Sequence, residues 1–125
     1  MLEMHGVSRR LCSFNDILPG FVFSGVYFSD KYLAAHGNEV RAFLRALIRA
    51  FDFIQQHENE ARSFLPKYIN VSESVAQQSA LRDLSGRVKE RLEMLDRQRD
   101  LLAKYGFIKA RSSIRGLVDY TYLPE

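Results

Sequence analysis

The chain has 125 residues, the size of one domain, and 46% of them are hydrophobic while 26% are charged. This composition is typical of globular proteins and excludes a disordered or low-complexity chain. The net charge of +3 comes from 18 basic and 15 acidic side chains that are interleaved along the sequence, so no basic block indicates nucleic-acid binding.

The sequence offers few groups for catalysis or metal binding. Its single cysteine, Cys12, cannot form an internal disulfide, and His5, His36 and His57 share no metal-ligand spacing. A phosphate loop, a dinucleotide fingerprint and a Gly-x-Ser-x-Gly motif are all missing from the sequence. We therefore expect no enzyme, no metal site and no cofactor.

The N-terminal residues do not form a secretory signal. Arg9 and Arg10 are followed by polar residues and Pro19, where a signal peptide needs an uninterrupted apolar stretch. No apolar run approaches the roughly 20 residues that span a bilayer. We expect residues 1–10 to be a flexible segment and the chain to have no transmembrane segment.

One stretch, Phe21–Phe28, has the composition of a β-strand. It reads Phe-Val-Phe-Ser-Gly-Val-Tyr-Phe and follows Pro19 and Gly20. Apolar residues at both odd and even positions predict a strand that is buried on both faces. The chain contains no second run of this kind, so the edges of the strand lack a partner. We expect the segment either to self-associate by strand pairing between copies or to stay loosely packed and exposed.

The rest of the chain has helical periodicity, which predicts a mainly α fold with one short strand. The predicted helices are Lys31–Ala35, Glu39–Gln56, Glu60–Ile69, Glu73–Leu84 and Arg87–Tyr105. The second is the best defined, because its apolar residues follow the three-and-four spacing of a buried stripe; they are Val40, Phe43, Leu44, Leu47, Ile48, Phe51 and Ile54. Arg41, Arg45 and Arg49 lie on another face, which we interpret as solvated rather than as an anion site.

Polar residues and glycines predict where these helices begin and end. The expected N-caps are Ser29 or Asp30, Asn59 and Ser72. The expected left-handed C-terminal residues are Gly37 and Gly106, with Phe107 completing a Schellman ending. Pro66 should kink or loosen the third helix. The aromatic tail after Ser113 should dock on a groove.

Four stretches in order carry a family resemblance: "DILPGFVFSGVYFSDKYLAAH", "NEVRAFLRALIRAFDFIQQHENEA", "LLAKYGFIK" and "LVDYTYLPE". Together they resemble the C-terminal part of the solute-binding proteins of bacterial ABC importers for nitrate, sulfonates, taurine and thiamine-precursor pyrimidines. The resemblance covers residues 11–125 and implies the C-terminal portion of a two-lobed α/β periplasmic-binding-protein fold of type II. The strand Phe21–Phe28 would then pair with strands from an earlier part of a longer protein.

The resemblance implies transport rather than catalysis. The full-length family binds a small, anionic or heterocyclic nutrient between its lobes and delivers it to an ABC permease. Phe21, Phe23, Ser24 and Tyr27 lie where the hinge strand of the family passes the ligand cleft, so they are the candidate ligand-binding residues. Core packing is the competing interpretation of the three aromatic residues. Because the cleft needs both lobes, we expect this truncated form or fragment to bind little alone.

The resemblance also implies a periplasmic location, although the chain as written would remain cytoplasmic without a signal peptide. An alternative function is a small helical DNA-binding or regulatory module. The stretch "SESVAQQSALRDLSGRVKERL" predicts two helices across a Ser-Gly turn, similar to a helix-turn-helix. Acidic residues on or near the second helix, such as Glu90, Glu93 and Asp96, oppose groove binding, so we expect no nucleic-acid partner.

Overall fold

The computed structural model describes residues 3, 6–82, 84, 88–109 and 113–124. Five helices lie within these residues: α1 (Phe14–Ile17), α2 (Asp30–Gln56), α3 (Glu58–Tyr68), α4 (Glu73–Gln78) and α5 (Leu92–Lys104). The mainly helical class is therefore confirmed. The described residues contain no strand, so the predicted strand is wrong.

The long helix α2 merges the first two predicted helices. Ser29 caps its N-terminus as expected, because the Ser29 hydroxyl accepts a hydrogen bond from the Tyr32 N–H at 3.2 Å. The helix bends at His36, whose φ of −132° and ψ of 31° are not helical. Gly37 was expected to end a separate helix in the left-handed conformation, but it has no positive φ and continues the helix. The expected helix end near Gly37 is thus a kink within one continuous helix.

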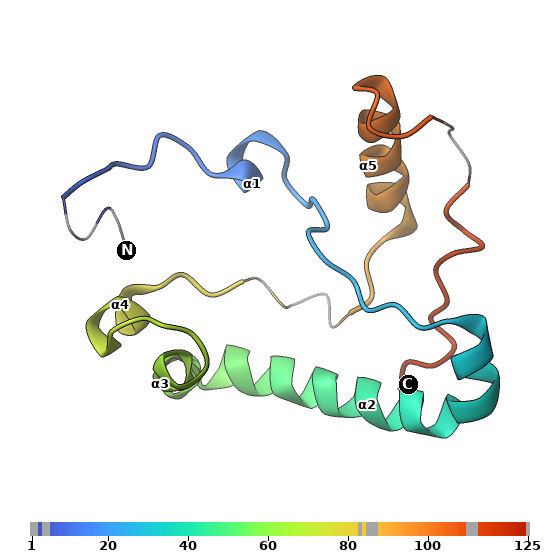
Figure 1. Ribbon diagram of the computed structural model, residues 1–125, viewed down its shortest axis with the longest axis horizontal. Coiled ribbons are helices and arrows are strands. Elements are labelled where there is room, and N and C mark those ends of the chain that lie inside the picture. The colour runs from blue at the N-terminus through green and yellow to red at the C-terminus, as the bar shows by residue number, and fades with distance from the viewer. Residues whose placement is uncertain (1–2, 4–5, 83, 85–87, 110–112, 125) are drawn as a thin grey trace.

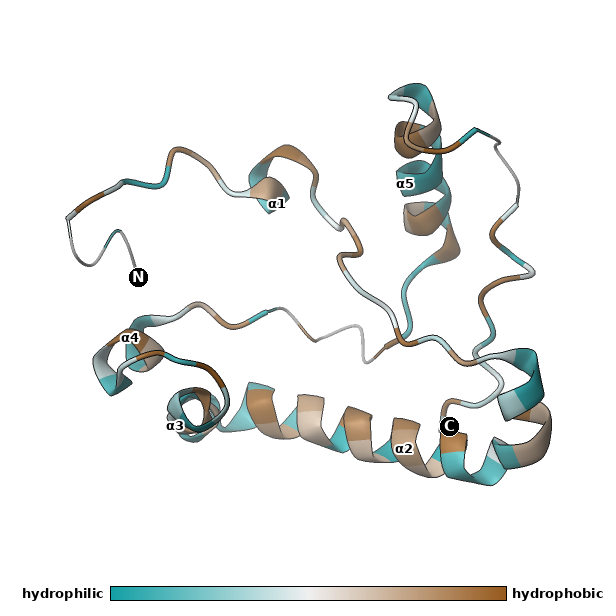
Figure 2. Ribbon diagram, in the orientation of Figure 1, coloured by the Kyte–Doolittle hydropathy of each residue, from teal (hydrophilic) through white to brown (hydrophobic). Residues whose placement is uncertain are grey.

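The buried apolar residues lie on α2, α3 and α4. Within the described residues, α2 packs on α3 and α3 packs on α4 (Figure 1), and no other pair of helices is in contact. Apolar and polar bands recur along α2 (Figure 2), as a stripe with helical spacing requires. The buried apolar residues are Val40, Leu44, Ile48, Ala61, Val75 and Ala76. Phe43 belongs to the predicted stripe but is 47% exposed, because it lies at the stripe's border and contacts Phe28 edge-on.

Helix α3 begins two residues earlier than predicted. Its N-cap is His57, so the assignment of Asn59 as the cap is wrong; the Asn59 side chain instead accepts a hydrogen bond from Arg62. The helix continues through Pro66, which lies in its last turn, and ends at Tyr68. The Tyr68 side chain at its end is exposed.

Helix α4 is shorter than predicted. Ser72 caps its N-terminus as expected, accepting from the Val75 N–H. The helix ends at Gln78 instead of Leu84, since Ser79 turns to an extended conformation. Two hydrogen bonds fix this ending: the Ser79 hydroxyl donates to the Val75 carbonyl at 2.8 Å, and the Ser79 carbonyl accepts from Arg62 Nε at 3.1 Å.

Helix α5 begins at Leu92 rather than Arg87, which itself lies outside the described residues. Val88 has a φ of 66°, a left-handed value that no helix interior allows. The C-terminus follows the prediction, because Gly106 has a φ of 77° and the Phe107 N–H donates to the Leu102 carbonyl. Phe107 is nevertheless 77% exposed, so the expected hydrophobic contact of this ending does not bury it.

The segment Phe21–Phe28 runs without regular structure between α1 and α2 (Figure 1). Phe23 is 76% exposed, Tyr27 90% and Val26 46%, which contradicts burial on both faces. The physical reason is that a strand needs a partner, and the described residues supply none. In the single chain the segment is thus exposed, and its pairing with a second copy stays a prediction.

Two connections hold α5 and the tail. The turn at residues 18–21 packs on α5, and a Cβ added to Gly20 would clash with Met94 Cε. The tail packs against α2, where Arg41 donates to the Thr121 carbonyl at 2.7 Å and stacks over the Tyr122 ring. The short helix α1 was not predicted, although Ser13 and Asp16 form the capping box that starts it.

Candidate functional site

Arg82 joins two of the four candidate ligand-binding residues. Its Nη1 donates to Ser24 Oγ at 3.3 Å, and its guanidinium lies 4.7 Å above the centre of the Phe23 ring. All three side chains belong to exposed residues. The cluster therefore presents a cation, a hydroxyl group and an aromatic face to solvent, a combination suited to an anion with a small apolar part.

The other two candidates lie apart from this cluster. Phe21 is partly buried and packs edge-to-face on Phe14, with ring centres 4.8 Å apart. It also faces α5 through Met94 and Gln98, so core packing describes its environment better than ligand contact. Tyr27 is 90% exposed, and its hydroxyl lies 3.4 Å from the position of a Cβ on Gly25.

The Gln98 side chain of α5 binds the backbone of the segment Phe21–Phe28. Its Oε1 accepts from the Val22 N–H at 2.9 Å, and its Nε2 donates to the Val22 carbonyl, also at 2.9 Å. A neighbouring strand would make the same pair of bonds to one residue. The Gln98 amide therefore satisfies both backbone groups of Val22, which fixes one end of the exposed segment on α5.

Sequence reasoning missed both Arg82 and Gln98. Arg82 lies 58 residues after Ser24, and Gln98 lies 76 residues after Val22. Neither occurs in a local motif, and both were expected on helices: Arg82 near the end of the fourth and Gln98 inside the fifth. Only the three-dimensional fold brings these side chains to the segment Phe21–Phe28, so no periodicity or spacing in the sequence could have identified them.

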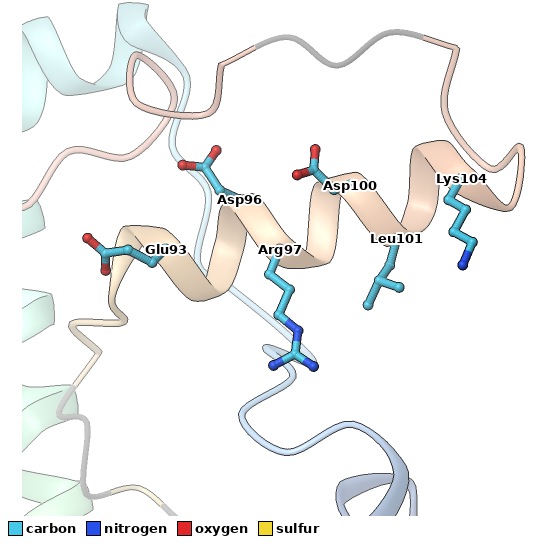
Figure 3. Close-up of a pocket in the computed structure, with 6 residues that line it drawn as sticks. All are labelled: Glu93, Asp96, Arg97, Asp100, Leu101 and Lys104. Carbon is cyan, nitrogen blue, oxygen red and sulfur yellow. The ribbon is translucent and has the colours of Figure 1, made fainter.

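A hollow on the surface of α5 is lined by Glu93, Asp96, Arg97, Asp100, Leu101 and Lys104 (Figure 3). All six belong to one helix, and Figure 3 shows Asp96 and Asp100 pointing away from Arg97, Leu101 and Lys104. Both carboxylates form ion pairs with Arg99. The arrangement is that of a solvated helix face, because α5 alone lines the hollow within the described part of the chain.

Hydrogen bonds and burial displace the pKa values of Asp16, Asp119 and Tyr120. Hydrogen bonds from the Ser13 N–H and then its hydroxyl lower the pKa of Asp16. The Thr121 hydroxyl and N–H lower the pKa of Asp119, and burial raises the pKa of Tyr120. In the described part of the chain no three His, Cys, Asp or Glu side chains lie together as metal ligands.

No described helix is long and apolar enough to cross a membrane. Comparisons with protein-family models, curated proteins and solved structures find no match for this chain.

Proposed function

We propose that the chain is the C-terminal part of a two-lobed solute-binding protein of an ABC importer and belongs to the class that binds nitrate, sulfonates, taurine or thiamine-precursor pyrimidines. The four ordered sequence stretches supply the resemblance, and one structural observation carries the proposal. A compact protein of 14.5 kDa would expose about 6,900 Å², whereas this chain exposes 10273 Å². So large a surplus is expected of a piece that packs against further polypeptide.

The position of the exposed surface agrees with this function. Phe23, Val26 and Tyr27 lie exposed in the segment that would cross between the lobes. In the described residues, no backbone–backbone hydrogen bond ties residues 23–28 to another segment. Strands from the preceding part of a longer protein would cover these side chains and satisfy these backbone groups.

The Arg82 cluster suggests how an anionic solute would be held. Nitrate and sulfonates carry planar or trigonal arrays of oxygens, which a guanidinium binds through paired N–H groups. The Ser24 hydroxyl would donate one further bond, and the Phe23 ring would contact an apolar portion of the solute. Hinge closure of a second lobe would supply the rest of the cleft. The chain alone would therefore bind weakly, with only half of the contacts.

The geometry gives no support to the DNA-binding alternative. That interpretation needs two helices across a short turn, but α4 ends at Gln78 and α5 begins at Leu92. The described residues between them, 79–82, 84 and 88–91, are not helical. We therefore retain only the solute-binding proposal.

The test joins the chain to what precedes it in the genome. We expect the DNA upstream of the Met1 codon to encode an α/β lobe, in frame or after a frameshift. The joined protein should bind nitrate, taurine, an alkanesulfonate or an aminopyrimidine in calorimetric titrations, while the chain alone should release little heat. An upstream region without such a lobe, or a joined protein that binds none of these solutes, would refute the proposal.

A further inference from the structure

The exposed segment has an unusual composition for a protein surface. From Ile17 to Ser29 the sequence contains no charged residue, and after Pro19 it contains no proline. Its aromatic and β-branched residues favour strands, and short uncharged segments of this kind pair readily when exposed. Natural proteins usually protect such a segment with charges, proline or a covering element. Here Gln98 covers the backbone of Val22, and Arg82 lies against the side chains of Phe23 and Ser24.

The contacts of Val22 show which edge of the segment is open. Both its N–H and its carbonyl point to α5, where the Gln98 amide binds them. In an extended chain the backbone groups of alternate residues point to the same side. Tyr27 folds over Gly25, as side chains two residues apart do on one face of such a chain. The backbone groups of Phe23, Gly25 and Tyr27 therefore point away from α5.

We infer that this open edge pairs with the same edge of a second copy of the chain, forming a two-stranded antiparallel ladder centred on Gly25. This register uses all three outward-pointing residues. It places Phe23 of one copy opposite Tyr27 of the other, and aromatic cross-strand pairs stabilise antiparallel ladders. A ladder centred on Ser24 instead would also pair Phe21 with the second copy. The Phe21 N–H is not available for this, because it already donates to the Leu18 carbonyl.

A second copy fits this edge better than a charged partner would. The segment has no charged side chain of its own, so its residues in two copies do not repel one another. The pairing is isologous, so it closes as a dimer. Gln98 blocks the opposite edge at Val22, which opposes growth into a longer sheet. The inference does not depend on the proposed function, because it concerns this chain alone.

Disulfide trapping tests the register. The exposed Cys12 is first replaced by Ser, and Gly25→Cys is added. Hydrogen-bonded antiparallel pairs have Cα atoms about 5.5 Å apart, which a disulfide can bridge. We expect the Cys12→Ser/Gly25→Cys protein to form a covalent dimer under mild oxidation. The matched control is Cys12→Ser/Ser63→Cys, with an exposed position on α3, which should cross-link at least tenfold more slowly. Equal rates for the two proteins would overturn the inference.

Light scattering across a concentration series tests the pairing without cysteine. Gly25→Pro removes an outward-pointing N–H, whereas Ser24→Pro removes one that points toward α5. We expect the unmodified chain to dimerise, Gly25→Pro to raise the dimer dissociation constant at least tenfold, and Ser24→Pro to change it less than threefold. Circular dichroism checks that both variants keep their helices. An unmodified chain that stays monomeric at every concentration, or two proline variants with equal effects, would overturn the inference.

Discussion

Gly20 is the residue at which backbone conformation and packing impose the same requirement. Its φ of 75° is left-handed, and an added Cβ would clash with Met94 Cε. A non-glycine residue costs about 1–2 kcal/mol at such a φ. The crowding costs less, because Met94 has a flexible end that can move. The turn at residues 18–21 therefore depends on glycine mainly through its backbone.

We predict that Gly20→Ala lowers the free energy of unfolding by about 1–2 kcal/mol in urea titrations. Gly116→Ala is the control, since no atom lies within 4 Å of its added Cβ and its φ is not left-handed. That variant should change stability by less than about 0.5 kcal/mol. Equal stability of Gly20→Ala and the unmodified chain would mean that the turn does not hold this conformation in solution.

Asp119 makes the docking of the tail sensitive to acid. Its carboxylate accepts from both the Thr121 hydroxyl and the Thr121 N–H, which lowers its pKa below the ordinary value of 3.8. Because the folded pKa is the lower one, the carboxylate contributes stability above about pH 4, and this contribution is lost as the pH falls through the folded pKa. The turn that presents the Thr121 carbonyl to Arg41 should loosen over the same range.

The expected outcome is that the NMR signals of Thr121 and Tyr122 stay constant from pH 7 to about pH 4 and shift only below it. Asp119→Asn should remove most of this acid transition, because an amide does not titrate there. A transition centred well above pH 4 would contradict the assignment to Asp119.

At the scale of elements, residues in the middle of the apolar stripe of α2 are buried, and those at its border are partly exposed. Leu44 is 8% exposed and faces the core, whereas Phe43 is 47% exposed and contacts Phe28 edge-on. Leu44→Ala should cost about 2–4 kcal/mol because it leaves a cavity in the small core. Phe43→Ala should cost about 1 kcal/mol, and Arg45→Ala less than about 0.5 kcal/mol on the solvated face. Denaturant titrations that rank Phe43 above Leu44 would mean that α2 is rotated.

The elements differ in how far the sequence predicts them. Period and caps locate α2, Ser29, Ser72 and the Gly106 ending, because these depend on residues within one turn of each other. The ends of α4 and α5 were misplaced, since the apolar spacing continues past the points where Ser79 and Val88 leave helical geometry. The prediction of a strand was wrong for a different reason. The composition that favours a strand can be read from neighbouring residues, but a strand forms only when a second strand pairs with it.

The residues of the candidate site could also be predicted only in part. Phe23 and Ser24 could be proposed from the sequence because they lie in one aromatic stretch. Arg82 and Gln98 could not, because only the fold brings them to that stretch across 58 and 76 residues. Sequence reasoning therefore identified the segment on which contacts converge but not the side chains that contact it.

At the scale of the whole molecule, the small core has to hold a large surface. Among the described residues, only the contacts of α2 with α3 and α3 with α4 join helices, and α5 is attached through the turn at residues 18–21 and Gln98. Aromatic side chains such as Phe23, Tyr27 and Phe107 remain more than three-quarters exposed. A chain with this arrangement should be more extended than a compact protein of equal length and should bind apolar probes.

We predict that the Gly25→Pro protein, studied because it should be monomeric, has a radius of gyration clearly above the value of about 14 Å for a compact chain of this length. Small-angle scattering at low concentration measures this radius, and the fluorescent probe ANS should bind the exposed aromatic surface. Circular dichroism must show retained helices, since an unfolded chain would also be expanded, to about 36 Å. A helical monomer with a radius near 14 Å and no ANS binding would mean that α5 and the segment 21–28 close onto the α2–α3–α4 core in solution. In that case the surplus surface, and with it the observation that carries the proposed function, would be lost.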